Sequence, residues 1–389
     1  MVLGMVFIGG LTRLTGSGLS IVEWKPLTGI LPPLTPTEWI REFSKYQQSP
    51  EFQKINFGMT LADFQSIFFL EYLHRLWGRL IGIVLLVPTL LMIFKKQHRE
   101  LWLFLALLWI LGLAQGVMGW VMVKSGLIHD PHVSPYRLSA HLFLGFMIFG
   151  ITLWMTLLLY KDRLSNSQLP QDDCHPEFIP QLSKVGKSNK SSSLRAQRSN
   201  PGKLENPLNN IYKFFSRLLR PALSRARNDD GESNKVLIRC SLFALFLVVL
   251  TALFGAFVAN LKAGLVYNTF PMMGESLIPR EFLTQFPWWR DLFENPVSAQ
   301  FIHRCLAILT AVFCGGLWVF QRRLVLSPSL TLAFNGMLIA VLVQVSLGIL
   351  TLLLAGPLLL ALLHQSVAFL VFGSLVYTLF LLYNKVFLE

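Results

Sequence analysis

The sequence contains apolar segments of about twenty residues separated by polar loops, and this pattern restricts the chain to few folds. A helix that crosses the ~30 Å hydrocarbon core of a bilayer needs about 20 apolar residues at ~1.5 Å per residue. Of the 389 residues, 53% are hydrophobic and only 14% are charged, whereas soluble domains are about a quarter charged. The sequence therefore excludes a soluble enzyme, a disordered chain and a secreted disulfide scaffold. It predicts an all-α polytopic membrane protein.

Eight such apolar segments are present, and we expect each to form a transmembrane helix. The first segment is short, because fifteen residues reach only about 22 Å, so the sequence predicts a truncated first helix whose full span would begin upstream of Met1. The segments lie at about 1–15, 66–94, 101–123, 137–160, 236–260, 298–320, 329–354 and 357–384.

The distribution of charge predicts which loops face the cytoplasm or matrix. Residues 161–239 carry 15 Lys and Arg against 8 Asp and Glu, and the short loops at 95–100 and 321–323 are also basic. The alternate loops are balanced, with 4 against 5 in 16–65 and 3 against 4 in 261–296. Because Lys and Arg accumulate on the cytoplasmic side, both termini and the basic loops are expected there. Orientation in the lipid bilayer thus accounts for the net charge of +13, and no nucleic acid is expected as a partner.

Residues 161–235 are predicted to be a basic, largely disordered insertion in the cytoplasmic or matrix loop, because Ser, Asn, Lys and Arg dominate part of it. Within it, residues 211–225 place apolar side chains on one helical face and basic ones elsewhere. This pattern predicts a helix that lies on an anionic leaflet. An RNA-binding function of the insertion is a weaker alternative.

An internal repeat divides the chain into two pseudo-symmetric four-helix bundles, an N-terminal bundle at 1–160 and a C-terminal bundle at 236–389. Duplicated membrane proteins of this kind place their functional sites in the bundle cores, on facing helices. The matching segments are 71–80 with 300–309, 114–126 with 343–356, 139–146 with 363–370, and 9–19 with 255–265.

Four histidines lie within the predicted spans, at matching positions of the two halves. Intramembrane ionisable side chains are costly and are candidates for function. A single histidine would more often just bond to a neighbouring helix, but two pairs at equivalent repeat positions are hard to obtain in that way. Two imidazoles that face each other across a bundle can hold a haem iron from both sides. A proton relay or a copper site is less favoured, because no cysteine, methionine or carboxylate cluster joins every pair. These candidates are His74 with His141, and His303 with His364.

One acidic residue distinguishes the two halves. Glu71 lies three residues before His74, so both share a helix face, whereas Gln300 occupies the equivalent position before His303. A carboxylate can accept a proton or stabilise a developing cation, and an amide does neither well. Glu71 is therefore the candidate catalytic residue, and the alternative is a capping or loop-facing glutamate.

Arg75 and Arg304 directly follow a histidine in each half. A guanidinium pairs with a carboxylate in bidentate fashion, so each is expected to bind a haem propionate. A phospholipid headgroup would serve equally well as their partner.

At these residues the chain resembles the haem A synthase family, membrane enzymes that supply haem A to terminal oxidases. The resemblance covers nearly the whole chain except about 161–235. One branch of that family has a cysteine pair in the first outer loop, and residues 16–65 contain no cysteine, so the chain is similar to the branch without it. The motifs that carry the resemblance are GGLTRLTGSGLSIVEWKPLTGILPP (9–33), EYLHRLWGR (71–79), QGVMGWVMVKSGL (115–127), VSPYRLSAHL (133–142), YNTFPMM (267–273), FENPVSAQFIHR (293–304) and QVSLGILTLL…LLHQ (344–365).

The resemblance implies an enzyme that oxidises the C8 methyl of haem O to a formyl by successive hydroxylations, with water as the oxygen source. It implies that His303, His364 and Arg304 bind a haem b cofactor, that His74, His141 and Arg75 bind the substrate haem O, and that Glu71 is catalytic. It places the protein in the bacterial or mitochondrial inner membrane, with haem O synthase and a second copy of the chain as partners.

Two other functions stay open at this point. A non-enzymatic bis-haem electron carrier would hold permanent haem b in both halves, and the presence of Glu71 beside only one histidine pair argues against it. A transporter would instead have a substrate cavity near the membrane midplane and no bound haem.

Overall fold

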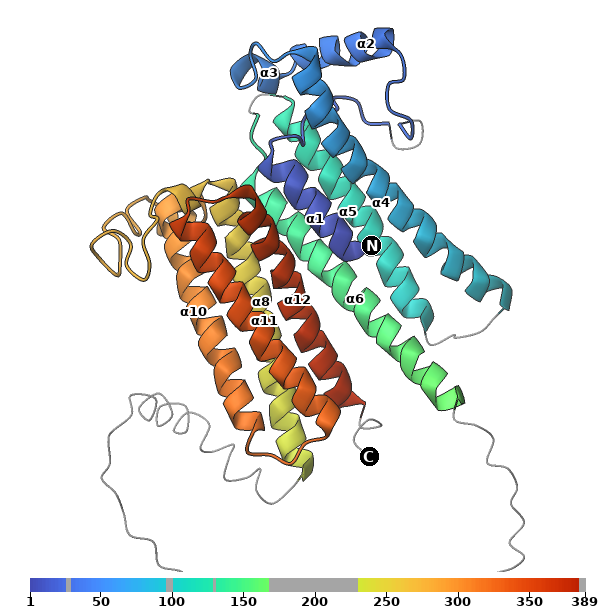
Figure 1. The fold of residues 1–389 in the computed structure, drawn as a ribbon, viewed down its shortest axis with the longest axis vertical. Helices are drawn as coiled ribbons and strands as arrows, with labels where there is room; N and C mark the ends of the chain where they lie inside the picture. Colours follow the sequence, from blue (N-terminus) through green and yellow to red (C-terminus); the bar gives the residue numbers. More distant parts are fainter. Residues whose placement is uncertain (26–28, 96–100, 129–130, 168–229, 385–389) are drawn as a thin grey trace, which may run out of the picture.

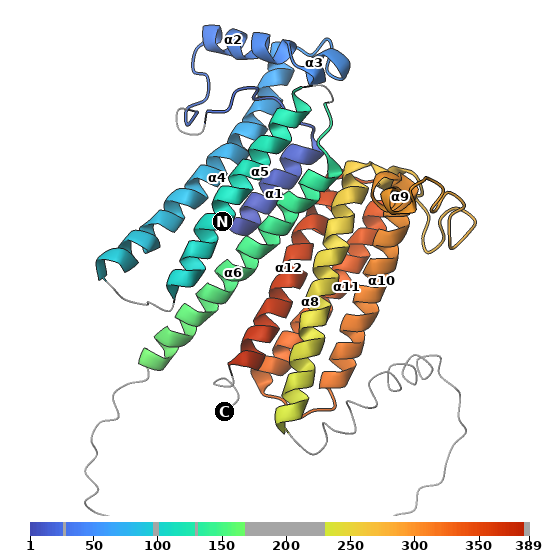
Figure 2. The same ribbon diagram turned by 180° about the vertical axis from the view of Figure 1, so that it is seen from behind.

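The computed structural model describes residues 1–25, 29–95, 101–128, 131–167 and 230–384, and the regular elements in these ranges are helices. They form two bundles side by side, with both sets of long loops at one end (Figures 1 and 2). The predicted insertion at 161–235 lies mostly outside the described residues, as does its predicted amphipathic helix at 211–225. The long helices are α4 (Leu61–Lys95), α5 (Trp102–Gly126), α6 (Pro135–Ser167), α8 (Asp230–Asn260), α10 (Pro296–Gln321), α11 (Pro328–Leu353) and α12 (Leu358–Tyr383).

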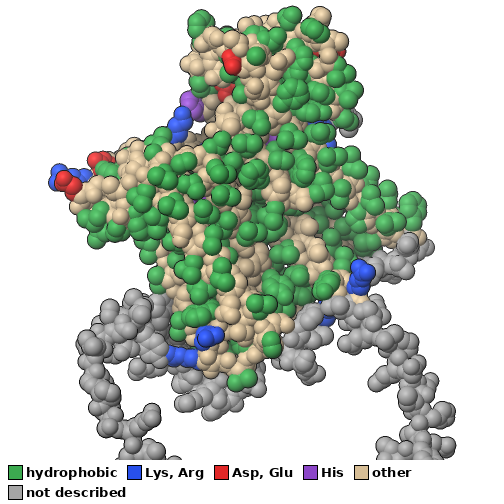
Figure 3. Space-filling model, viewed as in Figure 1, with side chains coloured by type: hydrophobic (Ala, Val, Ile, Leu, Met, Phe, Trp, Pro, Cys, Tyr) green, Lys and Arg blue, Asp and Glu red, His purple; other side chains and the backbone are tan. Residues whose placement is uncertain are grey.

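These seven helices are each long and apolar enough to cross a membrane, which confirms the prediction of an all-α polytopic membrane protein. The predicted count of eight spans is not reached by length, because α1 (Val2–Leu14) has only 13 residues. Its amino end lies about midway along the N-terminal bundle (Figure 1). Hydrophobic side chains cover the middle of the visible surface, whereas charged side chains are seen toward its two ends (Figure 3).

Local sequence signals fix where the helices of the C-terminal bundle begin. Asn295 and Ser327 precede α10 and α11, and each side chain accepts a hydrogen bond from a backbone N–H of the first turn. Proline follows each cap, at a position where the missing N–H costs nothing and the fixed φ suits the helix. These caps place His303 in the second turn of α10, near the end that bears the loops.

The two bundles are related by a pseudo-two-fold axis that passes between α6 and α12. Phe146 and Phe369 lie five residues after His141 and His364, and their rings stack on each other at 4.0 Å with an interplanar angle of 6°. Contact of a residue with its own equivalent is the mark of a two-fold interface. The neighbouring contacts are reciprocal as well, since a Cβ at Gly150 would lie 3.1 Å from Phe372 and one at Gly373 would lie 3.1 Å from Phe149.

The helix contacts repeat between the halves with one exception. In the C-terminal bundle α8 and α11 each pack against both α10 and α12, so α10 and α12 lie on a diagonal. The equivalents α1 and α5 pack on α4 and α6 in the same way, except that α4 and α5 touch only sparsely along their described lengths. A hydrogen bond from Trp109 Nε1 to Thr89 Oγ1 (3.1 Å) joins them. The N-terminal bundle is therefore less closed than its twin.

A small cap covers the outer end of the N-terminal bundle, where α4 extends beyond the bilayer and meets α2 (Pro36–Gln47) and α3 (Pro50–Lys54) (Figure 1). At ~1.5 Å per residue the 35 residues of α4 span about 52 Å, which exceeds the membrane core. The cap has its own aromatic core, formed by Trp39, Tyr46, Phe52, Phe64 and Phe68.

The second outer loop is organised around the buried carboxylate of Asp291, on the short helix α9 (Trp288–Glu294). It accepts hydrogen bonds from the backbone N–H groups of Leu283 (3.1 Å) and Gln285 (2.9 Å). It also accepts from the side chains of Asn295 and Ser298. This loop begins with the 3₁₀ turn η2 (Ala263–Leu265), and the carbonyl group of Tyr267 that follows accepts hydrogen bonds from side chains of α10.

The buried Glu51 makes the stability of the outer cap pH-dependent. Burial raises the pKa of Glu51 from 4.5 to about 7, and Tyr46 Oη donates to this carboxyl group at 3.0 Å. Because the folded-state pKa is the higher one, the stabilisation is fully present below pH 4.5 and is lost as the pH rises through 7. We expect the cap to lose on the order of 2 kcal/mol of local stability between pH 5 and 8. Hydrogen exchange of α2 and α3, corrected for the intrinsic rate, measures this loss.

The Glu51→Gln variant should remove this pH dependence, since an amide still accepts the Tyr46 hydrogen bond but does not titrate. The matched control is Glu42→Gln on α2 of the same cap, where the carboxylate is paired with Lys45. Equal pH dependence in wild type and Glu51→Gln would contradict the assignment.

Candidate functional site

The C-terminal bundle brings His303 of α10 and His364 of α12 together across its diagonal. Their ring centroids are 6.5 Å apart and the rings are nearly perpendicular, at 88°. Two opposed imidazole nitrogens at about 2 Å from one metal ion would separate the ring centres by roughly 6 Å. This spacing fits a haem iron bound on both sides. Among the described residues, no group of three or more His, Cys, Asp or Glu side chains could hold a metal ion, so the histidine pair is the donor set present here.

The hydrogen bond at His303 also suits metal ligation. Its Nδ1 lies 3.0 Å from the Thr251 carbonyl oxygen on α8. A carbonyl only accepts, so Nδ1 carries the proton and Nε2 keeps its lone pair for a metal. This backbone contact to a ligating imidazole fixes the tautomer and the ring orientation.

Each of the four imidazoles lies against a glycine of a neighbouring helix, at equivalent positions in the two halves. A Cβ in place of the glycine hydrogen would overlap the ring of His364, would crowd the rings of His303 and His74, and would make an ordinary contact with His141. The distances from that Cβ to the nearest ring atom are 3.1 Å for Gly255 with His303, 2.8 Å for Gly348 with His364, 3.1 Å for Gly9 with His74, and 3.6 Å for Gly119 with His141.

The N-terminal pair is arranged on the same diagonal, with His74 on α4 and His141 on α6. The two side chains interact electrostatically, and Nδ1 of His141 is buried without a hydrogen-bond partner in the described part of the chain. Nδ1 of His364 in the other pair is likewise buried and, among the described residues, unpaired, so the two sites share this feature. The sparse contact of α4 with α5 leaves this half the more accessible one.

Glu71 is buried, and four donors hold its carboxylate. Oε2 accepts from Ser20 Oγ (2.7 Å) and from the backbone N–H of Ile21 (2.8 Å). Oε1 accepts from Arg75 Nε (3.0 Å) and Nη2 (2.6 Å). Arg75 also donates to the carbonyl groups of Ile21 and Glu23. The pair therefore fastens the start of the first outer loop to α4.

The C-terminal half fastens its outer loop at the equivalent position, with an amide in place of the carboxylate and with no hydrogen bond between this amide and Arg304. Gln300 Nε2 donates to the Tyr267 carbonyl oxygen (3.0 Å), and Tyr267 is the repeat equivalent of Ile21. Arg304 donates to the same carbonyl (2.8 Å) and to those of Thr269 and Met272. Arg304 thus holds the second outer loop without a carboxylate partner within the described ranges, and we call this contact of the arginine with the loop carbonyl groups the latch of each half.

Both arginines differ in their contacts from the prediction. Arg75 and Arg304 were expected to bind haem propionates, and in the structure they hold outer-loop carbonyl groups, with Arg75 also paired to Glu71. A role for either arginine toward haem stays a prediction. Glu71 does lie at the loop, as its alternative interpretation predicts, but it is buried there and beside His74 in sequence.

Three features of the site were not predicted from the sequence: the glycines, the Ser20 contact and the shared latch. The signal for the glycines was present, because Gly9 and Gly255, like Gly119 and Gly348, occupy matching positions in the repeated segments. The latch contacts had no such signal, since loop conformation decides which carbonyl an arginine reaches.

The fold and the paired histidines define a duplicated, polytopic helical membrane protein with one diagonal imidazole pair in each half. Residues 1–179 and 211–376 match the sequence profile of the family described as "Cytochrome oxidase assembly protein" (COX15-CtaA), and the chain belongs to this family. The unmatched residues 180–210 lie inside the predicted insertion.

Curated relatives match nearly the full chain, and each is named "Heme A synthase". The relative from Nitrosospira multiformis is 40% identical, over 96% of this chain and 88% of its own length. The relative from Wolbachia pipientis of Culex pipiens is 36% identical over 99% and 96%, and that from Paramagnetospirillum magneticum is 39% identical over 94% and 86%. Seven helices in the described part of the chain are long and apolar enough to span a membrane, and with its bacterial relatives this makes the chain a multi-pass inner-membrane protein.

The glycine beside His364 provides a test of the histidine geometry. We expect Gly348→Ala to displace the imidazole and weaken haem retention by about 10–100-fold, the usual cost of disturbing the groups that orient a metal ligand. Visible absorbance of the purified protein measures bound haem. The matched control is Gly336→Ala on the same helix, where a Cβ meets no atom within 4 Å. Equal haem content in the two variants would show that Gly348 does not position His364.

Proposed function

We propose that the protein acts as a haem A synthase, an oxidoreductase that converts the C8 methyl of haem O to a formyl group and thereby supplies haem A for terminal oxidase assembly. The names of its relatives support this function. The observation that carries it is the difference between the two otherwise matching sites: a buried carboxylate, Glu71, lies in one and an amide, Gln300, in the other. Equal sites would suit two permanent cofactors, whereas unequal ones suit a substrate and a cofactor.

The proposed division assigns residues 1–160 to the substrate haem and residues 236–389 to a haem b cofactor, with 161–235 as an insertion between them. Helix packing supports this order. The C-terminal bundle is closed around His303 and His364, as befits a retained group. The N-terminal bundle, which holds His74 and His141, is open between α4 and α5, as befits a substrate that enters and a product that leaves.

Each hydroxylation of the methyl takes its oxygen atom from water and releases two electrons and two protons. Haem b, held by His303 and His364, would take these electrons one at a time and pass them to an external oxidant. Glu71 is the nearest candidate to take up protons, because carboxylates act as bases and stabilise positive charge. Of its donors only the Ser20 hydroxyl can also accept a proton, and it is bonded to Oε2 at 2.7 Å. Ser20 therefore offers the exit for a proton that arrives on Glu71.

The substrate chemistry also suggests partners. Haem O is hydrophobic and would be handed over by haem O synthase within the bilayer, and a second copy of the chain could complete the assembly. Neither partner is needed for the chemistry at Glu71.

Substitution of Glu71 by Gln tests the proposal. Gln300 indicates that an amide is accommodated at the equivalent position, so the variant should fold and keep its haem. Formyl formation should fall by about 10²–10⁴-fold, the usual contribution of a positioned base. Pyridine haemochrome analysis of protein supplied with haem O measures both haem retention and haem A formation.

The matched control is Gln300→Glu, which places a carboxylate beside the other latch and should not create a second oxidation site. Full activity of Glu71→Gln would remove Glu71 from the mechanism. Two haem b groups with no turnover of haem O in the wild type would instead favour the bis-haem electron carrier.

A further inference from the structure

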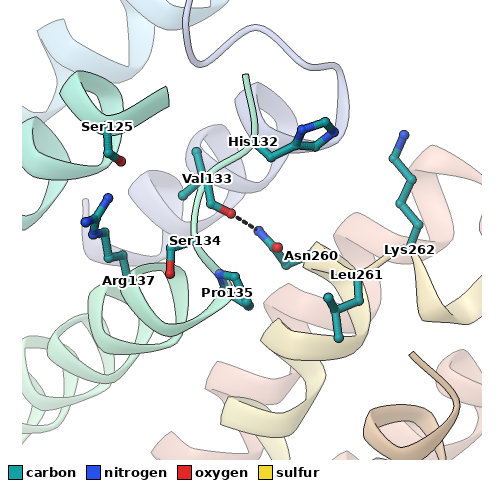
Figure 4. Close-up of a pocket in the computed structure, with 9 residues that line it drawn as sticks. All are labelled: Ser125, His132, Val133, Ser134, Pro135, Arg137, Asn260, Leu261 and Lys262. Carbon is teal, nitrogen blue, oxygen red and sulfur yellow. Dashed lines mark hydrogen bonds between the residues drawn. The ribbon is translucent and has the colours of Figure 1, made fainter. Parts of the chain in front are cut away.

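A cavity of about 580 Å³ lies between the two halves, at the end of the molecule that bears the outer loops. It is bounded by the end of α5, the start of α6 and the residues that follow α8 (Figure 4). A hydrogen bond from Asn260 Nδ2 to the Val133 carbonyl oxygen (2.8 Å) joins the halves there. The cavity is thus built jointly by both repeats.

The charged side chains that line this cavity are basic. Arg137 and Lys262 are among its lining residues, His132 is a third, and none of the described lining residues is acidic. Arg137 is half-buried and Lys262 is exposed, and neither side chain has a hydrogen bond or ion pair with any described residue. By contrast, Arg75 and Arg304 are occupied by carbonyl or carboxylate partners. Unpaired cations that line a cavity favour an anionic ligand.

Both cations depart from the internal repeat. The equivalent of Arg137 is Leu360, and the equivalent of Lys262 is Gly16. Gly16 and Lys262 both end a helix in the left-handed conformation, with φ of 68° and 51°. Glycine adopts this conformation freely, whereas a lysine is strained in it. A strained lysine where the twin position has glycine indicates that the side chain itself has a use.

The cavity also adjoins the site of the N-terminal half. Arg137 lies four residues before His141 on α6, so the two side chains share a helix face. Figure 4 shows Arg137 on one side of the segment 132–135 and Lys262 on the other. Two separated cations suit a ligand with two acidic groups.

We propose that this cavity binds the two carboxylates of the haem held between His74 and His141, with Arg137 and Lys262 as their cationic partners. The inference rests on the proposed function, because it concerns the substrate site of that reaction. A lipid phosphate offers a single anionic group and would leave one of the two cations unpaired, so the dicarboxylate fits better.

The test compares haem b with its dimethyl ester, in which both carboxylates are methylated. The protein is used with its C-terminal haem in place, in nanodiscs of phosphatidylcholine, and absorbance titration measures binding of a second haem. The wild type should bind haem b at least about tenfold more tightly than the ester, since a charge-assisted hydrogen bond is among the stronger polar contacts. This preference should disappear in the double variant Arg137→Leu, Lys262→Gly.

Two controls keep the result specific. The double variant Arg137→Lys, Lys262→Arg retains both charges and should keep the preference for haem b over its ester. The variant Arg280→Gln removes a charge from the exposed outer loop and should keep this preference as well. The change Lys262→Gly relieves the backbone strain of the left-handed conformation and should not destabilise the fold. The absorbance spectrum of the C-terminal haem shows whether each variant is folded.

Equal preference for haem b in the wild type and the double variant would overturn this inference while leaving the proposed function intact. No binding of a second haem by the wild type would instead contradict the proposed function. A lipid phosphate is tested by repeating the titration in phosphatidylglycerol nanodiscs and counting bound lipid by native mass spectrometry. If the double variant loses bound phosphatidylglycerol but keeps its preference for haem b, the cavity binds a lipid phosphate and the inference is overturned.

Discussion

The position of four imidazoles inside the bilayer is the constraint on which the rest of this structure depends. A histidine in a transmembrane helix must be satisfied or desolvated at a cost, and each of these lies against a glycine on the helix beside it. The missing side chain lets the ring lie between helices and directs it toward the bundle centre. In the C-terminal half the ring centroids of His303 and His364 are therefore 6.5 Å apart, a spacing that fits one metal ion bound between them.

Gene duplication explains why the arrangement occurs twice, and the departures from symmetry explain how the halves differ in use. The stacked Phe146 and Phe369 mark the axis, and the latch on the outer loop is shared. Two differences lie in the N-terminal half, a carboxylate where its twin has an amide and a sparse contact between α4 and α5, and a third is the pair of cations in the cavity between the halves. Each difference would serve a ligand that is bound, changed and released.

Much of this fold could be predicted from the sequence, because length, hydropathy and repeat matching determine spans and their pairing. The histidine positions followed from the same repeat. The contacts of Arg75 and Arg304 could not be predicted, since a guanidinium can bind either a propionate or backbone carbonyl groups and the path of the loop decides which carbonyl groups lie within its reach. The conformation of Lys262 could not be predicted either, because nothing in its local sequence indicates that the backbone there is left-handed.

The axial ligation of the bound haem tests the central claim most directly. Electron paramagnetic resonance of the purified ferric protein should show a low-spin haem with two imidazole ligands. His303→Ala and His364→Ala should each abolish that signal, whereas Trp318→Phe, on the same helix as His303, should leave it. An unchanged low-spin signal in both histidine variants would contradict the account, because the haem would then be held by other residues.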